Sequence, residues 1–206
     1  MKDEWFSDHL DLIKWAIVHR LAASHGLQHV AHIAFFSPSK TPSIHIDVDD
    51  HPVNDVVWRY FRDWKRMEQQ SLGDLRVRIF DQTWHGTARS DYVKSASCWL
   101  KQQKDARLVL LDPDTGLAPT SGGDHRHLRP SEVNDIWLAL KTGDILAIYQ
   151  HAPRGKNQWM QTQLSERYQD LGDLLGNGHH FQIAHRKEDH PKAAIFWLLK
   201  SSAVTP

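Results

Sequence analysis

Two spacings of apolar residues alternate along the chain, and each predicts a different kind of element. In residues 7–26, Leu10, Ile13 and Ile17 recur every three or four positions, the spacing of a helix that buries one face. The stretch "RLVLLDPDTGL" at 107–117 begins instead with an unbroken apolar run, which is typical of a strand buried on both faces. The sequence therefore predicts helices interleaved with buried strands.

The same two patterns divide the rest of the chain. Further helices are predicted at residues 53–70, 90–104, 131–142 and 157–175. Strands are predicted at residues 29–37, 75–81, 107–111 and 144–151, with two more around a polar turn within 179–200. The stretch 39–52 alternates weakly, and it is either a short strand or an excursion from the fold.

Strands that alternate with helices indicate right-handed crossovers and a mostly parallel sheet covered on both faces. We therefore predict a single α/β domain over residues 1–206, with a three-layer, Rossmann-like architecture and a C-terminal antiparallel hairpin. A terminal hairpin on such a sheet is the arrangement of the methyltransferase-like topology. Fold alone does not determine function, so the chemistry has to be argued from the strand ends.

Composition limits the partners and the cellular compartment that we expect, but it does not indicate a function. Lys and Arg together number 25, as do Asp and Glu, so a polyanionic partner such as nucleic acid has to be met by a local basic patch. The one cysteine, Cys98, excludes an intrachain disulfide and fits a reducing compartment. The N-terminal "MKDEWFSDHL" is too polar for a signal peptide, and no apolar run reaches membrane-spanning length. We expect a cytoplasmic protein with no membrane partner.

Asp112 and Asp114 stand one residue apart directly after the buried strand 107–111. One interpretation is a tight turn, in which the carboxylates bond local amides and Gly116 takes a positive φ. The other is a site for a hard divalent cation, Mg²⁺ or Mn²⁺, which prefers carboxylate oxygens. The pair alone does not decide between them.

Polar residues also follow the neighbouring predicted strands. His151 comes directly after strand 144–151 as a candidate general base or metal ligand. Arg154 and Lys156 come next in the chain and suit recognition of a phosphate. In an open α/β sheet, ligands bind beyond the carboxyl ends of the strands, so these groups would share one crevice with the two aspartates. The alternative is that they cap the loop or pair with the aspartates.

A further strand end carries an acid and an aromatic ring. Asp81 closes the predicted strand 75–81, and an acidic residue at such a position can hold ribose hydroxyls. Trp84 lies beyond the same strand end, where a nucleic-acid base could stack on it. A loop cap for Asp81 and a core position for Trp84 are the alternatives.

With "LVLLDPDTGL" followed about thirty residues later by "GDILAIYQHAPR", the chain resembles an uncharacterised bacterial family. That family has an Asp-Pro-Asp-Asn/Thr-Gly-Leu motif, a Tyr-Gln-His-x-x-Arg motif and a lysine in an N-terminal helix, here Lys14. It is distantly similar to adenine-N6 methyltransferases that act on ribosomal RNA and carry Asp-Pro-Pro-Tyr at the corresponding strand end. The resemblance implies a Rossmann-like methyltransferase fold, with Asp112 near the target amine and S-adenosylmethionine as cofactor.

The chain departs from that methyltransferase pattern in two places. Asp114 and Thr115 replace the proline and the aromatic residue that would stack on a flipped adenine, and "FFSPSKTPS" after the first strand lacks glycine. Three hypotheses follow. The first is a metal-dependent phosphodiester hydrolase or nuclease acting on nucleic acid or a nucleotide, with Asp112, Asp114 and His151 as catalytic groups. The second is an S-adenosylmethionine-dependent nucleic-acid methyltransferase, and the third is a non-catalytic binding module with the same fold.

Overall fold

The structure is a computed structural model, and the predicted helix at 53–70 lies outside the residues that it describes. The described ranges are residues 9–35, 43–46, 49–52, 73–84, 88–119, 122–152, 163–176, 180–185 and 193–201.

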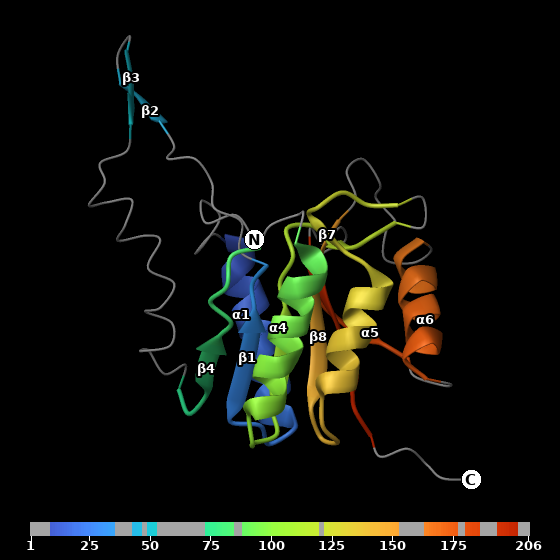
Figure 1. The fold of residues 1–206 in the computed structure, drawn as a ribbon. Helices are drawn as coiled ribbons and strands as arrows, with labels where there is room; N and C mark the ends of the chain where they lie inside the picture. Colours follow the sequence, from blue (N-terminus) through green and yellow to red (C-terminus); the bar gives the residue numbers. More distant parts are fainter. Residues whose placement is uncertain are drawn as a thin grey trace.

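Helices and strands occur in the order that the apolar spacing predicts (Figure 1). The helices are α1 (His9–Ser24), α4 (Arg89–Gln102), α5 (Pro130–Ala139) and α6 (Gln163–Leu175). The strands of the main sheet are β1 (His29–Ile33), β4 (Arg76–Ile79), β5 (Leu108–Leu111), β8 (Ile145–His151), β9 (Gln182–His185) and β10 (Ala193–Leu199). The weakly alternating stretch contains a separate antiparallel pair, β2 (Ser43–Ile46) with β3 (Asp49–Pro52).

The main sheet has six strands in the order β4-β1-β5-β8-β10-β9. β4, β1, β5 and β8 pair in parallel, with Val30 of β1 level with Val77 on one side and Leu108 on the other. β10 is antiparallel to both β8 and β9. The predicted α/β class and the C-terminal antiparallel hairpin are thus confirmed. The reversed strand between β8 and β9 gives the sheet its methyltransferase-like topology.

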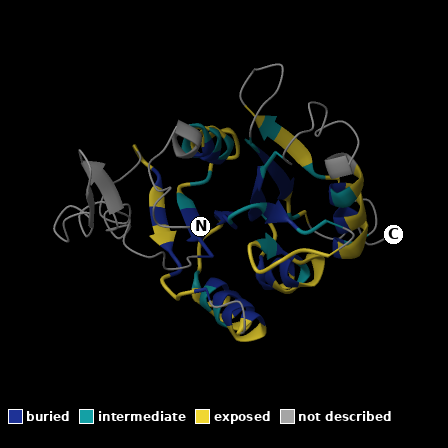
Figure 2. Cartoon of the chain, turned by 90° about the horizontal axis from the view of Figure 1, so that it is seen from above, coloured by how far each residue is buried: buried dark blue, intermediate teal, exposed yellow. Residues whose placement is uncertain are grey.

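Helices cover both faces of the sheet, as Figure 2 shows from above. α1 packs on one face through Val18 and Ala22, against strand residues such as Leu110 and Ile195. α4, α5 and α6 pack on the other face, against residues that include Val109 of β5. Successive residues of a strand point to opposite faces, so β5 alternates between the α1 face and the α4 face. The three predicted layers are present.

Two very short strands were not predicted. β6 (Gly116–Leu117) and β7 (His127–Leu128) pair in parallel within what the sequence suggests is a turn and a polar loop. Each has two residues, too few for a period-2 pattern to identify.

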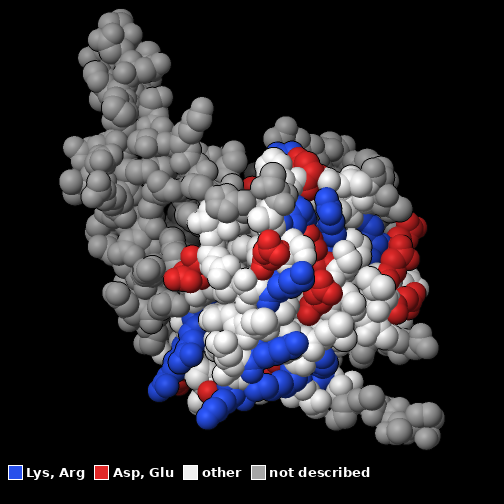
Figure 3. Space-filling model, in the orientation of Figure 1, with Lys and Arg blue, Asp and Glu red and all other residues white. Residues whose placement is uncertain are grey.

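Charge is unevenly distributed on the face shown in Figure 3, where Lys and Arg gather over the lower part. The elements at that lower end in Figure 1 are β4, the end of α4 and the loops after α4 and α5, and their exposed basic residues are Arg76, Arg78, Lys101, Lys104 and Lys141. Acidic residues line α6, where Glu166, Asp170 and Asp173 are exposed. Among the residues that the structure describes, no helix has the length and apolar character needed to cross a bilayer.

Candidate functional site

The carboxyl ends of four neighbouring parallel strands meet at one edge of the sheet, the upper edge in Figure 1. β1 lies between β4 and β5, so the chain leaves β1 for a strand on one side and later builds outward on the other. Such a reversal of strand order marks the place where open α/β sheets bind ligands. The residues next to it are those that follow β1 and β5, including Phe35, Asp112 and Asp114.

Asp112 is buried at 1% exposure and faces α1 rather than solvent. Lys14 of α1 donates to Asp112 Oδ2 at 2.7 Å, and Nε2 of His32 in β1 lies 3.0 Å from the same oxygen. Lys14 is itself 2% exposed and lies over the ring of Tyr149, 5.0 Å from its centroid. The rings of Trp15 and His32 pack in a T-shaped arrangement with their centroids 5.3 Å apart. Asp112, Lys14 and His32 therefore form a buried ionic cluster beneath α1.

The electrostatics of this cluster favour the charged form of Asp112. Burial alone would raise the pKa of the carboxyl, but the Lys14 ammonium and the hydrogen bond from His32 outweigh it. Together they hold the pKa of Asp112 well below its usual range. The carboxylate is thus a fixed negative charge whose Oδ2 is already committed to two donors.

Asp114 lies on the other side of the turn from Asp112. It is half-buried and lines a hollow with Pro113, Phe35, Trp84 and the segment 125–127. Phe35 and Trp84 belong to the core on the α4 face, whereas the partners of Asp112 lie on the α1 face. The hollow has room for about one water molecule. The two carboxylates therefore lie on opposite sides of the turn, with Asp112 toward α1 and Asp114 toward the hollow.

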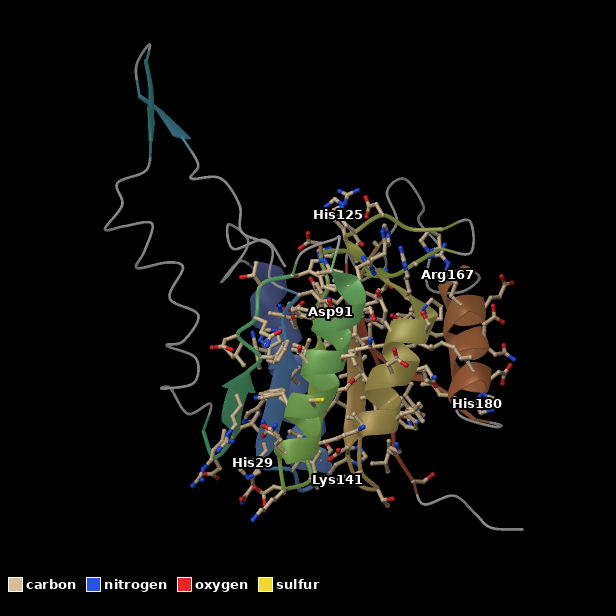
Figure 4. All side chains as sticks on the ribbon, in the orientation of Figure 1. His29, Asp91, His125, Lys141, Arg167 and His180 are labelled. Atoms are coloured by element: carbon tan, nitrogen blue, oxygen red, sulfur yellow. The ribbon has the colours of Figure 1, made fainter. Side chains whose placement is uncertain are left out.

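Residues 125–127, here called the strap, cross above the carboxyl ends of the strands, near the His125 label in Figure 4. Their backbone carbonyls point inward and accept hydrogen bonds. Trp84 donates to the carbonyl of His125 at 2.9 Å, Thr115 to that of Arg126 at 2.9 Å, and Arg89 to that of His127 at 2.7 Å. Arg89 also donates to the carbonyl of His125, at 3.3 Å, so side chains from the body of the protein bond all three carbonyls of the strap.

Arg89 joins the strap to α5. It is 8% exposed and makes a bidentate pair with Glu132, with two N–O distances of 2.7 Å. Its guanidinium also lies 4.5 Å from the ring centroid of Trp84. Bidentate guanidinium–carboxylate pairs fix geometry as well as adding energy, so this pair sets the position of α4 and α5 under the strap.

Gln150 connects the end of β8 to the turn after β5. Its amide nitrogen donates to the carbonyl of Thr115 at 2.8 Å, and its amide oxygen accepts from the Leu117 amide at 2.8 Å. The Tyr168 hydroxyl also donates to that oxygen, at 3.2 Å. Gly116 has φ +106°, and a Cβ there would overlap the Gln150 side chain. Gly116 thus takes the positive φ that the turn interpretation predicts, whereas the Asp112 carboxylate bonds Lys14 and His32 rather than local amides.

The other predicted site residues differ in burial and in the side chains that they contact. His151 is half-buried, and its ring packs on Tyr149 with the centroids 4.9 Å apart. Asp81 is exposed two residues after β4. Trp84 is 4% exposed, and its ring packs on Phe35 and Arg89, so this conformation offers no free surface for a stacking base. Arg154 and Lys156 lie outside the described residues.

The divalent-cation interpretation gains no support from this arrangement. Asp112 faces a lysine and a histidine, and Asp114 faces a different side of the turn. Within the described ranges, no group of three His, Cys, Asp or Glu side chains is placed to hold a metal ion.

Comparisons with known proteins add little to this geometry. No protein-family model and no curated protein matches the chain. One similar solved structure is a crystal structure of a DUF574 family protein from Streptomyces avermitilis MA-4680. It is 11% identical with a TM-score of 0.44, over 90% of this chain and 80% of that one. Similarity at this level says nothing about a shared reaction, and the motif-based resemblance stays a prediction.

Sequence reasoning missed His32 and Arg89 as parts of this region. His32 has a detectable signal, because it interrupts an otherwise apolar strand and a buried polar side chain needs a partner. Arg89 has none, since it stands at the start of a helix like any solvated basic residue. Lys14 enters the sequence analysis only through the family resemblance.

Proposed function

We propose that the protein binds S-adenosylmethionine at the carboxyl ends of β1 and β5 and methylates an amine of a nucleic acid. The observation that carries the proposal is the reversal of strand order at β1, with Phe35 and Asp114 beside it. The methyltransferase-like topology is compatible with this activity, and the structure offers no comparable support for a phosphodiester hydrolase.

The residues after β1 and β4 fit an adenosyl ligand in two respects. Phe35 has φ +46°, a left-handed conformation that non-glycine residues rarely adopt. The chain thereby makes at Phe35 a turn for which glycine is the usual residue, and such strain is often found at functional sites. Asp81, exposed beyond the strand next to β1, is available to the hydroxyls of a ribose.

The small volume of the hollow limits how the ligand would be held. With room for about one water molecule, the hollow cannot enclose an adenosyl group, so the ligand would contact its rim. Bound S-adenosylmethionine would supply a methyl group on a positively charged sulfur. Asp114 is the carboxylate on that rim, and we assign it the role of accepting a hydrogen bond from the target amine.

Isothermal titration calorimetry with S-adenosylmethionine and S-adenosylhomocysteine tests the proposal. We expect saturable heat with both, and a roughly tenfold weaker affinity for Asp81→Ala, since a lost hydrogen bond contributes about 1.4 kcal/mol. Asp170→Ala is the matched control, because Asp170 is an exposed acid on α6. Absence of heat at millimolar ligand would contradict the proposal.

Transfer of a radioactive methyl group from S-adenosylmethionine to RNA or DNA then separates the two remaining hypotheses. Incorporation that Asp114→Asn abolishes would support catalysis. Binding without incorporation would favour the non-catalytic module.

A further inference from the structure

We propose that Lys14, Asp112 and His32 form a positioning network, which sets the direction of the Asp112–Gly116 turn and does not itself contact the ligand. The three residues come from α1, the end of β5 and β1, and both donors reach the same oxygen, Asp112 Oδ2. The inference rests on the proposed function only where ligand affinity is the measured quantity.

Burial excludes direct contact between this network and a ligand. Lys14, Asp112 and His32 are each at most 2% exposed. Trp15 packs against His32 and Tyr149 against Lys14, so an aromatic ring lies beside each of the two donors. Any influence on the ligand site has to pass through the backbone.

The backbone path from the network to the site is short on both strands. Asp114 follows Asp112 by two residues, with Pro113 between them, and a proline ring fixes φ so that little slack is available. Phe35 follows His32 by three residues, and it lines the hollow together with Asp114. The amide of Asp112 also donates to the carbonyl of Ile33 at 3.0 Å, which ties the two strand ends together. The network therefore lies directly before the two segments that line the hollow, the one that ends at Phe35 and the one that contains Asp114.

A contribution to folding stability does not by itself explain why charged residues are buried in this cluster. The residues around the cluster on the α1 face are apolar, including Val18, Leu110 and Ile195. An apolar replacement of a buried ion pair is often as stable as the pair, whereas removal of one partner is strongly destabilising. What the charged cluster adds is direction, since two donors fix the rotation of one carboxylate.

The decisive variant is the double substitution Lys14→Met with Asp112→Leu, compared with each single substitution. We expect each single change to lower the Tm by roughly 10 °C, and the double variant to regain most of that loss. Hydrogen exchange of the backbone amides in 114–117 should nevertheless be about tenfold faster in the double variant than in the wild type. Its Kd for S-adenosylhomocysteine should be at least about tenfold higher.

Asp144→Asn is the matched control. Asp144 is a fully buried carboxylate near Arg107 at the opposite end of the sheet. The substitution should lower the Tm by roughly 10 °C, about as much as Asp112→Leu does, and leave both the exchange of 114–117 and the Kd within about twofold of the wild type.

His32→Gln and His32→Leu keep the inference testable if the double variant does not fold. Both retain the Lys14–Asp112 pair. Glutamine can still donate to Asp112, so we expect near-wild-type exchange with glutamine and faster exchange with leucine.

Wild-type exchange of 114–117 in the double variant, or equal exchange in the two His32 variants, would overturn the inference. If the wild type does not bind S-adenosylhomocysteine, the proposed function fails, and the exchange measurements alone decide the positioning role.

Discussion

Two features of the position of Gly116 favour glycine over any other residue. Its φ of +106° is a conformation that side chains disfavour, and the amide of Gln150 occupies the space where a Cβ would lie. That amide also makes the hydrogen bonds to Thr115 and Leu117 that close the turn. The residue therefore determines how closely β8 approaches the turn after β5.

Gly116→Ala should lower the free energy of unfolding by about 3 kcal/mol, because backbone strain and overlap with Gln150 add together. Gly122→Ala is the control, since Gly122 has φ +92° and no atom lies within 4 Å of its would-be Cβ. It should cost only about 1 kcal/mol, the contribution of the backbone alone. Urea unfolding measures both values, and equal losses would show that Gln150 gives way without cost.

Individual residues were the least predictable part of the site. Asp112 and Asp114 are correctly placed at a strand end, yet the sequence gives no sign that they face opposite sides of the turn. Lys14 and His32 precede Asp112 by 98 and 80 residues, so no local spacing relates them to it. Contacts this distant depend on strand order and helix placement, which one sequence does not reveal.

At the scale of elements, the strap depends on α4 and α5 through the Arg89–Glu132 pair. The polar stretch "APTSGGDHRHLRP" at 118–130 is compatible, by its sequence, with a flexible lid, a nucleic-acid contact or a solvated surface loop. Residues 122–126 are exposed, as in a solvated surface loop, while the strap carbonyls accept hydrogen bonds from Trp84, Thr115 and Arg89. Outward-facing ionic contacts add to this, because Asp124 bonds both Arg126 and His127. In the described part of the loop, these hydrogen bonds hold the strap beside the hollow that Asp114 lines.

Arg89→Met should make the strap more mobile, because Arg89 donates hydrogen bonds to its carbonyls. The substitution removes a bidentate pair and leaves Glu132 buried without its cation, so we expect a loss on the order of 3 kcal/mol in stability. Hydrogen exchange in 124–128 should rise more than in β5, whose sheet contacts are untouched. Lys94→Met, an exposed change on the same helix, should stay within about 0.5 kcal/mol of the wild type. Unchanged exchange in 124–128 would mean that Trp84 and Thr115 suffice to hold the strap.

Elements themselves were predictable because their signals are local. The runs "LVLL" and "ILAI" identified two central strands. The apolar spacing within 157–175 predicted a helix, and α6 lies inside that range. β6 and β7 escaped prediction because two-residue strands have no periodicity. Their pairing places Gly116 beside His127, flanked by the hydrogen bonds of Gln150 and Arg89.

At the scale of the whole molecule, charge is balanced overall and separated locally. The exposed basic residues at the lower part of Figure 3 form the kind of local patch that a nucleic-acid partner would require. The patch lies toward the amino ends of the strands, so a nucleic acid that contacts both the patch and Asp114 has to extend along the molecule.

Charge reversal at Lys101 and Lys104 should weaken binding to single-stranded RNA or DNA and reduce its dependence on salt. For every phosphate that a lysine no longer neutralises, the slope of log K against log salt should fall in magnitude by about 0.7. Neutralising the acids of α6, Glu166→Gln with Asp170→Asn, should not weaken binding. Fluorescence anisotropy at several salt concentrations measures both, and an unchanged slope in the Lys101/Lys104 variant would exclude this surface as the binding site for the nucleic acid.

The position of β10 has a consequence for how the molecule assembles during synthesis. β10 follows β8 and β9 in the chain, yet it lies between them and pairs with both. β9 cannot join the sheet until residues 193–199 have left the ribosome, so a nascent chain ending before them exposes the pairing edge of β8. Parallel pairing of β4, β1, β5 and β8 is complete earlier, since all of their residues precede position 152. The edge of β8 is therefore the surface that a chaperone has most reason to cover while the chain is being made.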